Sequence, residues 1–169
     1  MDHPENQYLD LIKHILKNGT FEDGRNGRTK TVFGYSMRYS LRDGVVPLLT
    51  TKRVAWKSCF HELIWFIRGC TDNTKLLEKN VPIWDANATR EFLDSRGLTK
   101  NEENDLGPVY GHQWRHFNAS YSNCHEDYEG KGIDQLQNII NMLKDQNQRT
   151  SRRVVLSAWN PCQIDEMAL

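Results

Sequence analysis

Apolar residues recur at helical spacing in two long parts of the chain. Between residues 8 and 16 they fall at positions i, i+3, i+4, i+7 and i+8, which predicts an amphipathic helix that ends near Asn18 and Gly19. Residues 133–143 carry the same stripe and predict a second amphipathic helix. The polar stretch 88–104, with few apolar anchors, predicts a short helix followed by an exposed loop.

A third helix is predicted over residues 59–67, where the pattern differs. This segment is apolar on nearly every side apart from His61 and Glu62, and it stops at Arg68 and Gly69. A helix that is apolar all round is expected to be buried, and a glycine just after it is a common helix cap. We therefore expect Glu62 to lie deep in the protein.

Alternation of apolar and polar residues predicts strands. Residues 33–41 alternate with a period of two, which indicates a half-buried strand, and residues 154–156 (Val-Val-Leu) indicate a short one. Residues 24–30 form a basic loop with two glycines ahead of the first strand. Together these elements predict one layered domain of the α/β (α+β) class over residues 1–169.

Composition and charge favour a cytoplasmic globular protein: 38% of the residues are hydrophobic, 26% are charged, and Lys+Arg and Asp+Glu balance at 22 each. No apolar run is long enough to cross a membrane, and the balanced charge argues against dedicated nucleic-acid binding. The start of the chain lacks the features of a secretory signal. The four cysteines include no C-x-x-C pair, and no histidine pair has zinc spacing, so we expect neither a metal site nor a disulfide framework.

Glu62 is a candidate acid or base, because burial disfavours the charged carboxylate and raises its pKa towards the range useful for proton transfer. The alternative is a carboxylate that reaches solvent or a structural partner. Arg25 and Arg28 in the basic loop, and the pair Arg152 and Arg153, offer guanidinium groups for a phosphate. Doubled arginines are, however, usually a solvated surface.

Aromatic residues provide candidates for the wall of a pocket that holds a flat heterocycle, since their rings are large and rigid. The candidates are Trp84, Tyr110, Trp114 and Phe117. The alternative is that they are simply core. His61, His112 and His116 have no paired nucleophile in the sequence and are expected to be structural or hydrogen-bonding groups.

Four long blocks, in order along the chain, resemble thymidylate synthases: residues 47–53 (PLLTTKR), 61–66 (HELIWF), 105–115 (DLGPVYGHQWR) and 152–161. The similarity runs from about residue 7 to residue 169. Residues 90–99 resemble the longer eukaryotic and viral members, and the opening residues 8–12 are similar to the synthase half of enzymes fused to dihydrofolate reductase. The resemblance therefore allows for a reductase domain upstream.

The resemblance implies the reductive methylation of dUMP to dTMP, in which 5,10-methylenetetrahydrofolate supplies the carbon and the hydride and no metal takes part. Glu62 would manage proton transfers, and Tyr110 would lie near the nucleophile. Lys52 and Trp84 would bind the folate.

The resemblance assigns the dUMP phosphate to Arg25, Arg152 and Arg153. The last two would reach into the neighbouring subunit's site, which implies a homodimer with shared active sites. The implied fold is a mixed sheet packed with helices, incomplete at the C-terminus. Arg28 stands where the family's loop has a small residue, which bears on how Arg25 is placed.

The nucleophilic cysteine of the family follows Met-Ala-Leu in a Pro-Cys-His motif, so it is expected just after Leu169. Cys162 follows a proline but precedes Met-Ala-Leu, and Gln163 stands where the motif has histidine, so we assign Cys162 no nucleophilic role. Residues 1–169 alone are therefore expected to be inactive. The alternatives are half of a split enzyme that needs a complementing C-terminal polypeptide, and a non-catalytic dUMP-binding or regulatory protein.

Overall fold

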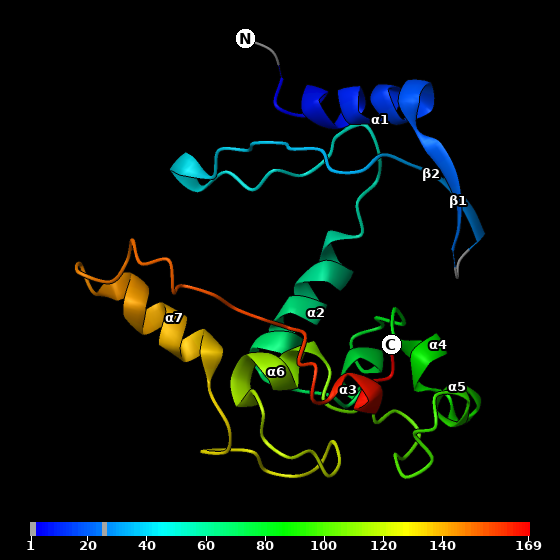
Figure 1. The fold of residues 1–169 in the computed structure, drawn as a ribbon, viewed down its shortest axis with the longest axis vertical. Coiled ribbons are helices and arrows are strands. Elements are labelled where there is room, and N and C mark those ends of the chain that lie inside the picture. The colour runs from blue at the N-terminus through cyan, green and yellow to red at the C-terminus, as the bar shows by residue number, and fades with distance from the viewer. Residues whose placement is uncertain (1–2, 25–26) are drawn as a thin grey trace. The chain divides into compact units, whose positions relative to one another are not determined.

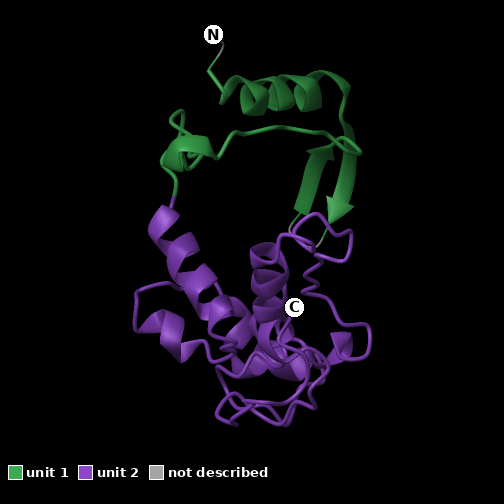
Figure 2. Cartoon of the chain, turned by 90° about the vertical axis from the view of Figure 1, so that its left-hand side faces the viewer, with its two compact units in different colours: residues 1–54 green, residues 55–169 purple. Residues whose placement is uncertain are grey.

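The computed structural model describes residues 3–24 and 27–169 and divides into two compact units, Met1–Val54 and Ala55–Leu169 (Figure 2). Each unit is described by itself. The single domain expected over residues 1–169 stays a prediction. Helices together with an antiparallel pair of strands confirm the mixed α and β class.

Unit 1 begins with helix α1 (Asn6–Asn18) and continues into strands β1 (Thr20–Gly24) and β2 (Gly27–Thr31) (Figure 1). The helix confirms the predicted amphipathic stripe. The strands are antiparallel, with Thr20 opposite Thr31 and Gly24 opposite Gly27. Residues 28–30 therefore belong to a strand, and the prediction that they lie in a loop is wrong.

The strand predicted over residues 33–41 is also wrong, because this segment pairs with no strand in the described chain. The side-chain amide of Gln7 takes the place of a partner strand. It accepts a hydrogen bond from the Arg38 N–H at 2.8 Å and donates one to the Arg38 carbonyl at 2.7 Å. Backbone polar groups need partners, and here one glutamine satisfies both groups of a residue.

Glu5 anchors the end of unit 1 to its beginning. Its carboxylate is buried and accepts backbone and hydroxyl hydrogen bonds from both Thr50 and Thr51, at 2.5–2.9 Å. These bonds to the charged form lower the pKa of Glu5 to about 2, the Thr50 hydroxyl being the largest cause. The short 3-10 turn Arg42–Gly44 completes the unit.

Unit 2 is helical. Its helices are α2 (Trp56–Ile67), α3 (Thr74–Leu77), α4 (Asp85–Ala88), α5 (Arg90–Ser95), α6 (Tyr110–His116) and α7 (Gln135–Lys144), followed by a 3-10 turn at Ile164–Glu166. The predicted helices at 59–67 and 133–143 correspond to α2 and α7, and α5 is the short helix expected within 88–104. No helix in the described ranges is both long and apolar enough to span a membrane.

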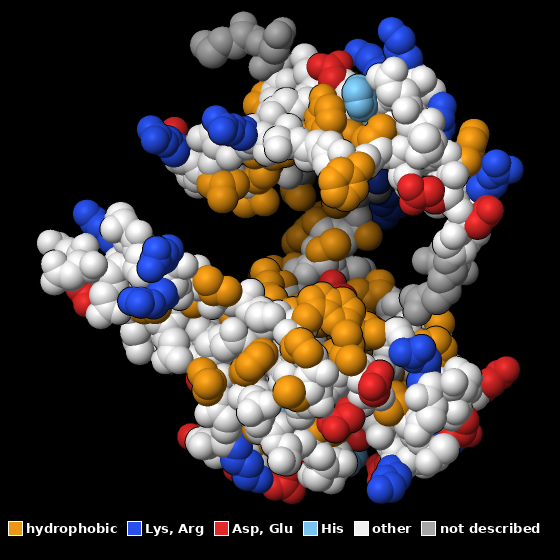
Figure 3. Space-filling view, viewed as in Figure 1, with side chains coloured by type: hydrophobic (Ala, Val, Ile, Leu, Met, Phe, Trp, Pro, Cys, Tyr) orange, Lys and Arg blue, Asp and Glu red, His pale blue; other side chains and the backbone are white. Residues whose placement is uncertain are grey.

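The composition of helix α2 predicted that it is buried on all sides, and this prediction is wrong. Trp65 is its one fully buried residue, whereas Phe60 and Leu63 are exposed. Hydrophobic side chains gather on the upper part of the face of unit 2 seen in Figure 3, and charged groups lie along its lower edge. The predicted glycine cap is confirmed, because Gly69 follows the end of α2 with a left-handed φ of +70°.

The core of unit 2 joins residues that are distant in the sequence. Leu76, Leu93 and Leu106 are almost fully buried together with Met167 and Ala168. The Ala168 N–H donates to the Leu106 carbonyl at 3.0 Å, which fixes residues 160–169 against the core. Buried apolar area is the main stabilising term for such a cluster.

Residues 154–156 do not form the predicted strand. The side chain of Gln135 binds the backbone of the neighbouring Ser157. It accepts from the Ser157 N–H at 3.0 Å and donates to the Ser157 carbonyl at 2.8 Å.

Candidate active site

Three of the residues predicted to act in chemistry meet in unit 2. Glu62 lies on α2, Trp84 just before α4, and Tyr110 at the first position of α6. The indole Nε1–H of Trp84 donates a hydrogen bond to Glu62 Oε1 at 2.8 Å. The rings of Trp84 and Tyr110 pack edge to face, with their centroids 6.0 Å apart. The fold thus joins a carboxylate, an indole and a phenol.

Phe66 lies at the centre of the aromatic surroundings, one turn along α2 from Glu62. Its ring is 5.6 Å from that of Tyr110 and 5.5 Å from that of Trp114, both edge to face. Such arrangements are the favoured geometry of aromatic pairs and hold the rings rigidly. Of the aromatic candidates, Phe117 makes no ring contact with this group among the described residues.

Trp159 extends the aromatic group and was missed in the sequence. Its ring packs edge to face on Tyr110 at 5.6 Å, and the residue is 51% exposed. A half-exposed tryptophan that packs on Tyr110 offers a flat face to a ligand. Its position inside a recognisable block, residues 152–161, was the one available signal.

The electrostatics favour hydrogen-bond donation by Tyr110. Burial raises the pKa of its hydroxyl, and the negative charge of Glu62 raises it further. Tyr110 therefore keeps its proton at neutral pH. Glu62 itself is half-buried rather than deep. Among the described residues its second oxygen, Oε2, accepts no hydrogen bond, so that oxygen faces a ligand or water freely.

The remaining predicted residues lie elsewhere. Arg152 and Arg153 are exposed in a turn, and in the described part of the chain neither forms an ion pair. Lys52 belongs to unit 1, where its Nζ lies 5.9 Å from the centroid of the Tyr8 ring. Arg25 lies outside the described residues. Their assignment to phosphate and folate stays a prediction.

The four cysteines are free thiols. Burial raises the pKa of Cys70, and burial together with Asp105 and Asp72 raises that of Cys124 to about 12. Neither is a thiolate at neutral pH, which is the form a nucleophile requires. Cys162 is exposed, and its N–H donates to Asn160 Oδ1 at 3.1 Å.

A buried amide network holds the segment around Trp159 in place. Gln113 Nε2 donates to Gln163 Oε1 at 3.0 Å, and Asn160 Nδ2 donates to the same oxygen at 3.0 Å. Gln163 Nε2 in turn donates to the Ala119 carbonyl at 2.9 Å. Buried polar networks of this kind fix one geometry when every member is satisfied. Sequence analysis did not find this network, because its members come from α6 and from residues beyond 159.

The sequence is similar to those of known proteins over nearly its whole length. A model of the family described as thymidylate synthase matches residues 6–169. The bifunctional dihydrofolate reductase-thymidylate synthase of Leishmania major is 51% identical over 169 residues, which cover 99% of this chain and 32% of that protein. The thymidylate synthase of Homo sapiens is 53% identical over 168 residues, covering 99% of this chain and 53% of that protein.

The thymidylate synthase of Ascaris suum is 51% identical over 170 residues, which cover 57% of its length. The chain thus spans about a third of the bifunctional relatives and about half of the others. The blocks that carry the likeness include Glu62, Tyr110 and the arginine pair 152–153. The chain belongs to the thymidylate synthase family.

Proposed function

We propose that this chain contributes the folate side and the proton-handling groups of an enzyme that converts dUMP to dTMP with 5,10-methylenetetrahydrofolate. The observation that carries the proposal is the contact of Glu62 with Trp84, 2.8 Å from indole nitrogen to carboxylate oxygen, beside the protonated Tyr110. A carboxylate held in this way inside an aromatic wall suits a reaction that moves protons on a flat ring.

The aromatic residues fit the ring systems of both substrates. Trp159 presents a half-exposed indole and Tyr110 packs against it, so a flat pyrimidine or pterin finds a stacking surface there. When bound, methylenetetrahydrofolate supplies the one-carbon unit and the hydride. The residues of this chain orient the rings and exclude water from them.

Proton handling falls to Glu62 and Tyr110. The Trp84 N–H fixes one oxygen of the Glu62 carboxylate, which leaves the other oxygen to exchange a proton with substrate or with an ordered water. Tyr110 keeps its proton and donates a hydrogen bond into the same space. The nucleophilic thiolate that completes covalent catalysis is proposed to come from a cysteine outside residues 1–169.

The basic groups are proposed to hold the anionic ends of the substrates. Arg152 and Arg153 are exposed, and their forked guanidinium groups suit the phosphate of dUMP bound by a second copy of the chain. This makes the enzyme a homodimer with shared active sites. Arg25 would contact the nucleotide phosphate, and Lys52 the acidic tail of the folate.

Further features of the proposal concern the whole protein. A reductase domain upstream of this chain is supported by relatives that are named as bifunctional reductase-synthases. The balanced charge of the sequence favours a cytoplasmic location without a membrane or a nucleic acid as partner.

The test is Glu62→Gln in the complete enzyme. We expect turnover to fall by at least about 100-fold, because amide nitrogen and oxygen cannot exchange a proton as a carboxylate does. Glu91→Gln, an exposed substitution in α5, is the matched control and should leave turnover unchanged. Turnover of the Glu62 variant close to that of the unmutated enzyme would remove Glu62 from the mechanism. Binding of dUMP without turnover by the unmutated enzyme would instead favour a non-catalytic protein.

A further inference from the structure

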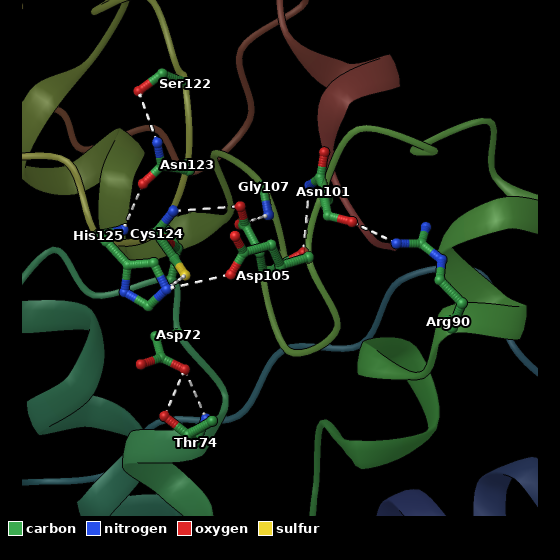
Figure 4. Close-up of polar contacts among 12 residues, drawn as sticks. Asp72, Thr74, Arg90, Asn101, Asp105, Gly107, Ser122, Asn123, Cys124 and His125 are labelled. Atoms are coloured by element: carbon green, nitrogen blue, oxygen red, sulfur yellow. Dashed lines mark hydrogen bonds and ion pairs between the residues drawn. The ribbon is translucent and has the colours of Figure 1, made fainter.

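We propose that unit 2 carries a zinc site formed by Asp72, Cys124 and His125, separate from the residues assigned to catalysis. One ligand atom of each lies within 4.8 Å of those of the others. Figure 4 shows how Cys124 and His125 lie near Asp72. The sequence predicted no metal site, because it has no C-x-x-C pair and no histidine pair at zinc spacing. Asp72 lies far along the chain from the other two residues, and no spacing motif connects them.

Asp72 brings a buried carboxylate to this cluster. The residue is 6% exposed, and its Oδ1 accepts hydrogen bonds from the Thr74 N–H at 2.8 Å and the Thr74 hydroxyl at 2.6 Å. Within the described ranges its other oxygen, Oδ2, accepts no hydrogen bond. Oδ2 does not belong to the buried polar atoms that lack a partner, so it is reached by solvent and a cation can approach it.

Cys124 and His125 already have the separation that zinc requires. The sulfur of Cys124 lies 3.6 Å from His125 Nε2. Tetrahedral zinc with bonds of about 2.3 Å to sulfur and about 2.0 Å to nitrogen places these two atoms roughly 3.5 Å apart. Three protein ligands leave the fourth position of a tetrahedral ion to water.

Hydrogen bonds fix the loop that carries Cys124 and His125. The carboxylate of Asp105, which is fully buried, accepts hydrogen bonds from the Cys124 N–H at 3.2 Å and from the Tyr121 hydroxyl at 2.6 Å. The N–H of His125 is bound by Asn123 Oδ1 at 2.9 Å. Partners of this kind orient metal ligands and raise affinity, so little reorganisation is needed on binding.

The donor set selects the metal. Sulfur and imidazole nitrogen with one carboxylate suit Zn²⁺, whereas Mg²⁺ and Ca²⁺ prefer oxygen ligands alone. Coordination releases the thiol proton of Cys124 to solvent. The bound ion would join the segment between α2 and α3 to the surface excursion at residues 118–132, which is a structural rather than a catalytic task.

The first test titrates the reduced full-length chain with Co²⁺, a spectroscopic substitute for zinc, and then displaces it with Zn²⁺. We expect one equivalent to give a sulfur-to-cobalt charge-transfer band, and Asp72→Asn and His125→Ala each to weaken binding by more than about tenfold. Cys162→Ser alters an exposed cysteine outside the cluster and is the matched control. Absence of the band, or equal affinity in all variants, overturns the site.

The second test does not depend on spectroscopy. Zinc binding to the folded state raises Tm, and at a given zinc concentration the rise grows with the logarithm of the affinity. We expect Zn²⁺ to raise the Tm of the unmutated chain and of Cys162→Ser, but not that of His125→Ala. The His125 side chain is 65% exposed, so its removal leaves the fold intact. An equal rise in His125→Ala would mean that zinc binds elsewhere and would refute the proposal.

Discussion

His112 makes the stability of unit 2 depend on pH. Its imidazole is fully buried between the rings of Tyr121 and Tyr128, with centroids 5.1 and 4.7 Å away. Nε2 donates a hydrogen bond to the Ala119 carbonyl at 3.3 Å, while Nδ1 has no partner within the described part of the chain. Burial, the largest cause, lowers the pKa of His112 to about 4.

The size of the effect follows from the two pKa values. Below the ordinary pKa of 6.5 the unfolded chain binds a proton at His112 that the folded chain excludes until the pH reaches about 4. The stabilising contribution is therefore complete above pH 6.5 and is lost as the pH falls. One pKa unit is worth about 1.4 kcal/mol, so the loss at pH 5 is about 2 kcal/mol and approaches about 3 kcal/mol below pH 4.

The assay compares urea unfolding of the unmutated chain and of His112→Phe at pH 7.5 and pH 5. Phenylalanine keeps the edge-to-face contacts but does not titrate, and the Ala119 carbonyl keeps its hydrogen bond from Gln163. The pKa of the neighbouring His116 is also lowered by burial, but His116 is present in both proteins and cancels. We expect His112→Phe to lose about 2 kcal/mol less between the two pH values. Equal losses would refute the reasoning.

Two further predictions concern backbone contacts. Gly107→Ala should destabilise the chain by more than about 3 kcal/mol in urea unfolding, because a Cβ there would lie 2.0 Å from the Glu166 carbonyl oxygen. Gly97→Ala, at a φ of +76° but in open space, should cost only about 1 kcal/mol for its left-handed backbone, and equal costs would exclude the clash. Glu5→Gln should speed hydrogen exchange of the amides at residues 50–51 and remove the loss of stability that the unmutated chain shows as the pH falls from 4.5 towards 2. Unchanged exchange rates in that variant would show that the carboxylate does not hold these amides.

The helices were predictable because their pattern is local. The stripe of 8–16 and that of 133–143 each contain the information for one helical face, and α1 and α7 follow it. The strands failed because pairing is not local. Nothing in residues 33–41 reveals that the side chain of Gln7 binds the backbone of Arg38, and nothing in residues 154–156 reveals that they have no partner strand in the described part of the chain.

The candidate site also contains residues that were predicted and residues that were missed. Glu62, Trp84 and Tyr110 were named from their residue types and from the resemblance, and the structure brings them together. Trp159 and the Asp72 cluster were missed, since each depends on contacts between segments far apart in the sequence. Residue types indicate which chemistry is available, whereas the fold decides which groups meet.

The return of residues 160–168 to the core also has a consequence for the folding pathway of unit 2. The helices that precede this segment are closed by nearby contacts and form quickly, but the bond from Ala168 to the Leu106 carbonyl must wait for a long loop to close. The entropy of closing such a loop grows slowly with its length, so the stability of the core suffers little. The long loop therefore slows folding, and docking of residues 160–168 is the late step that completes the hydrophobic core.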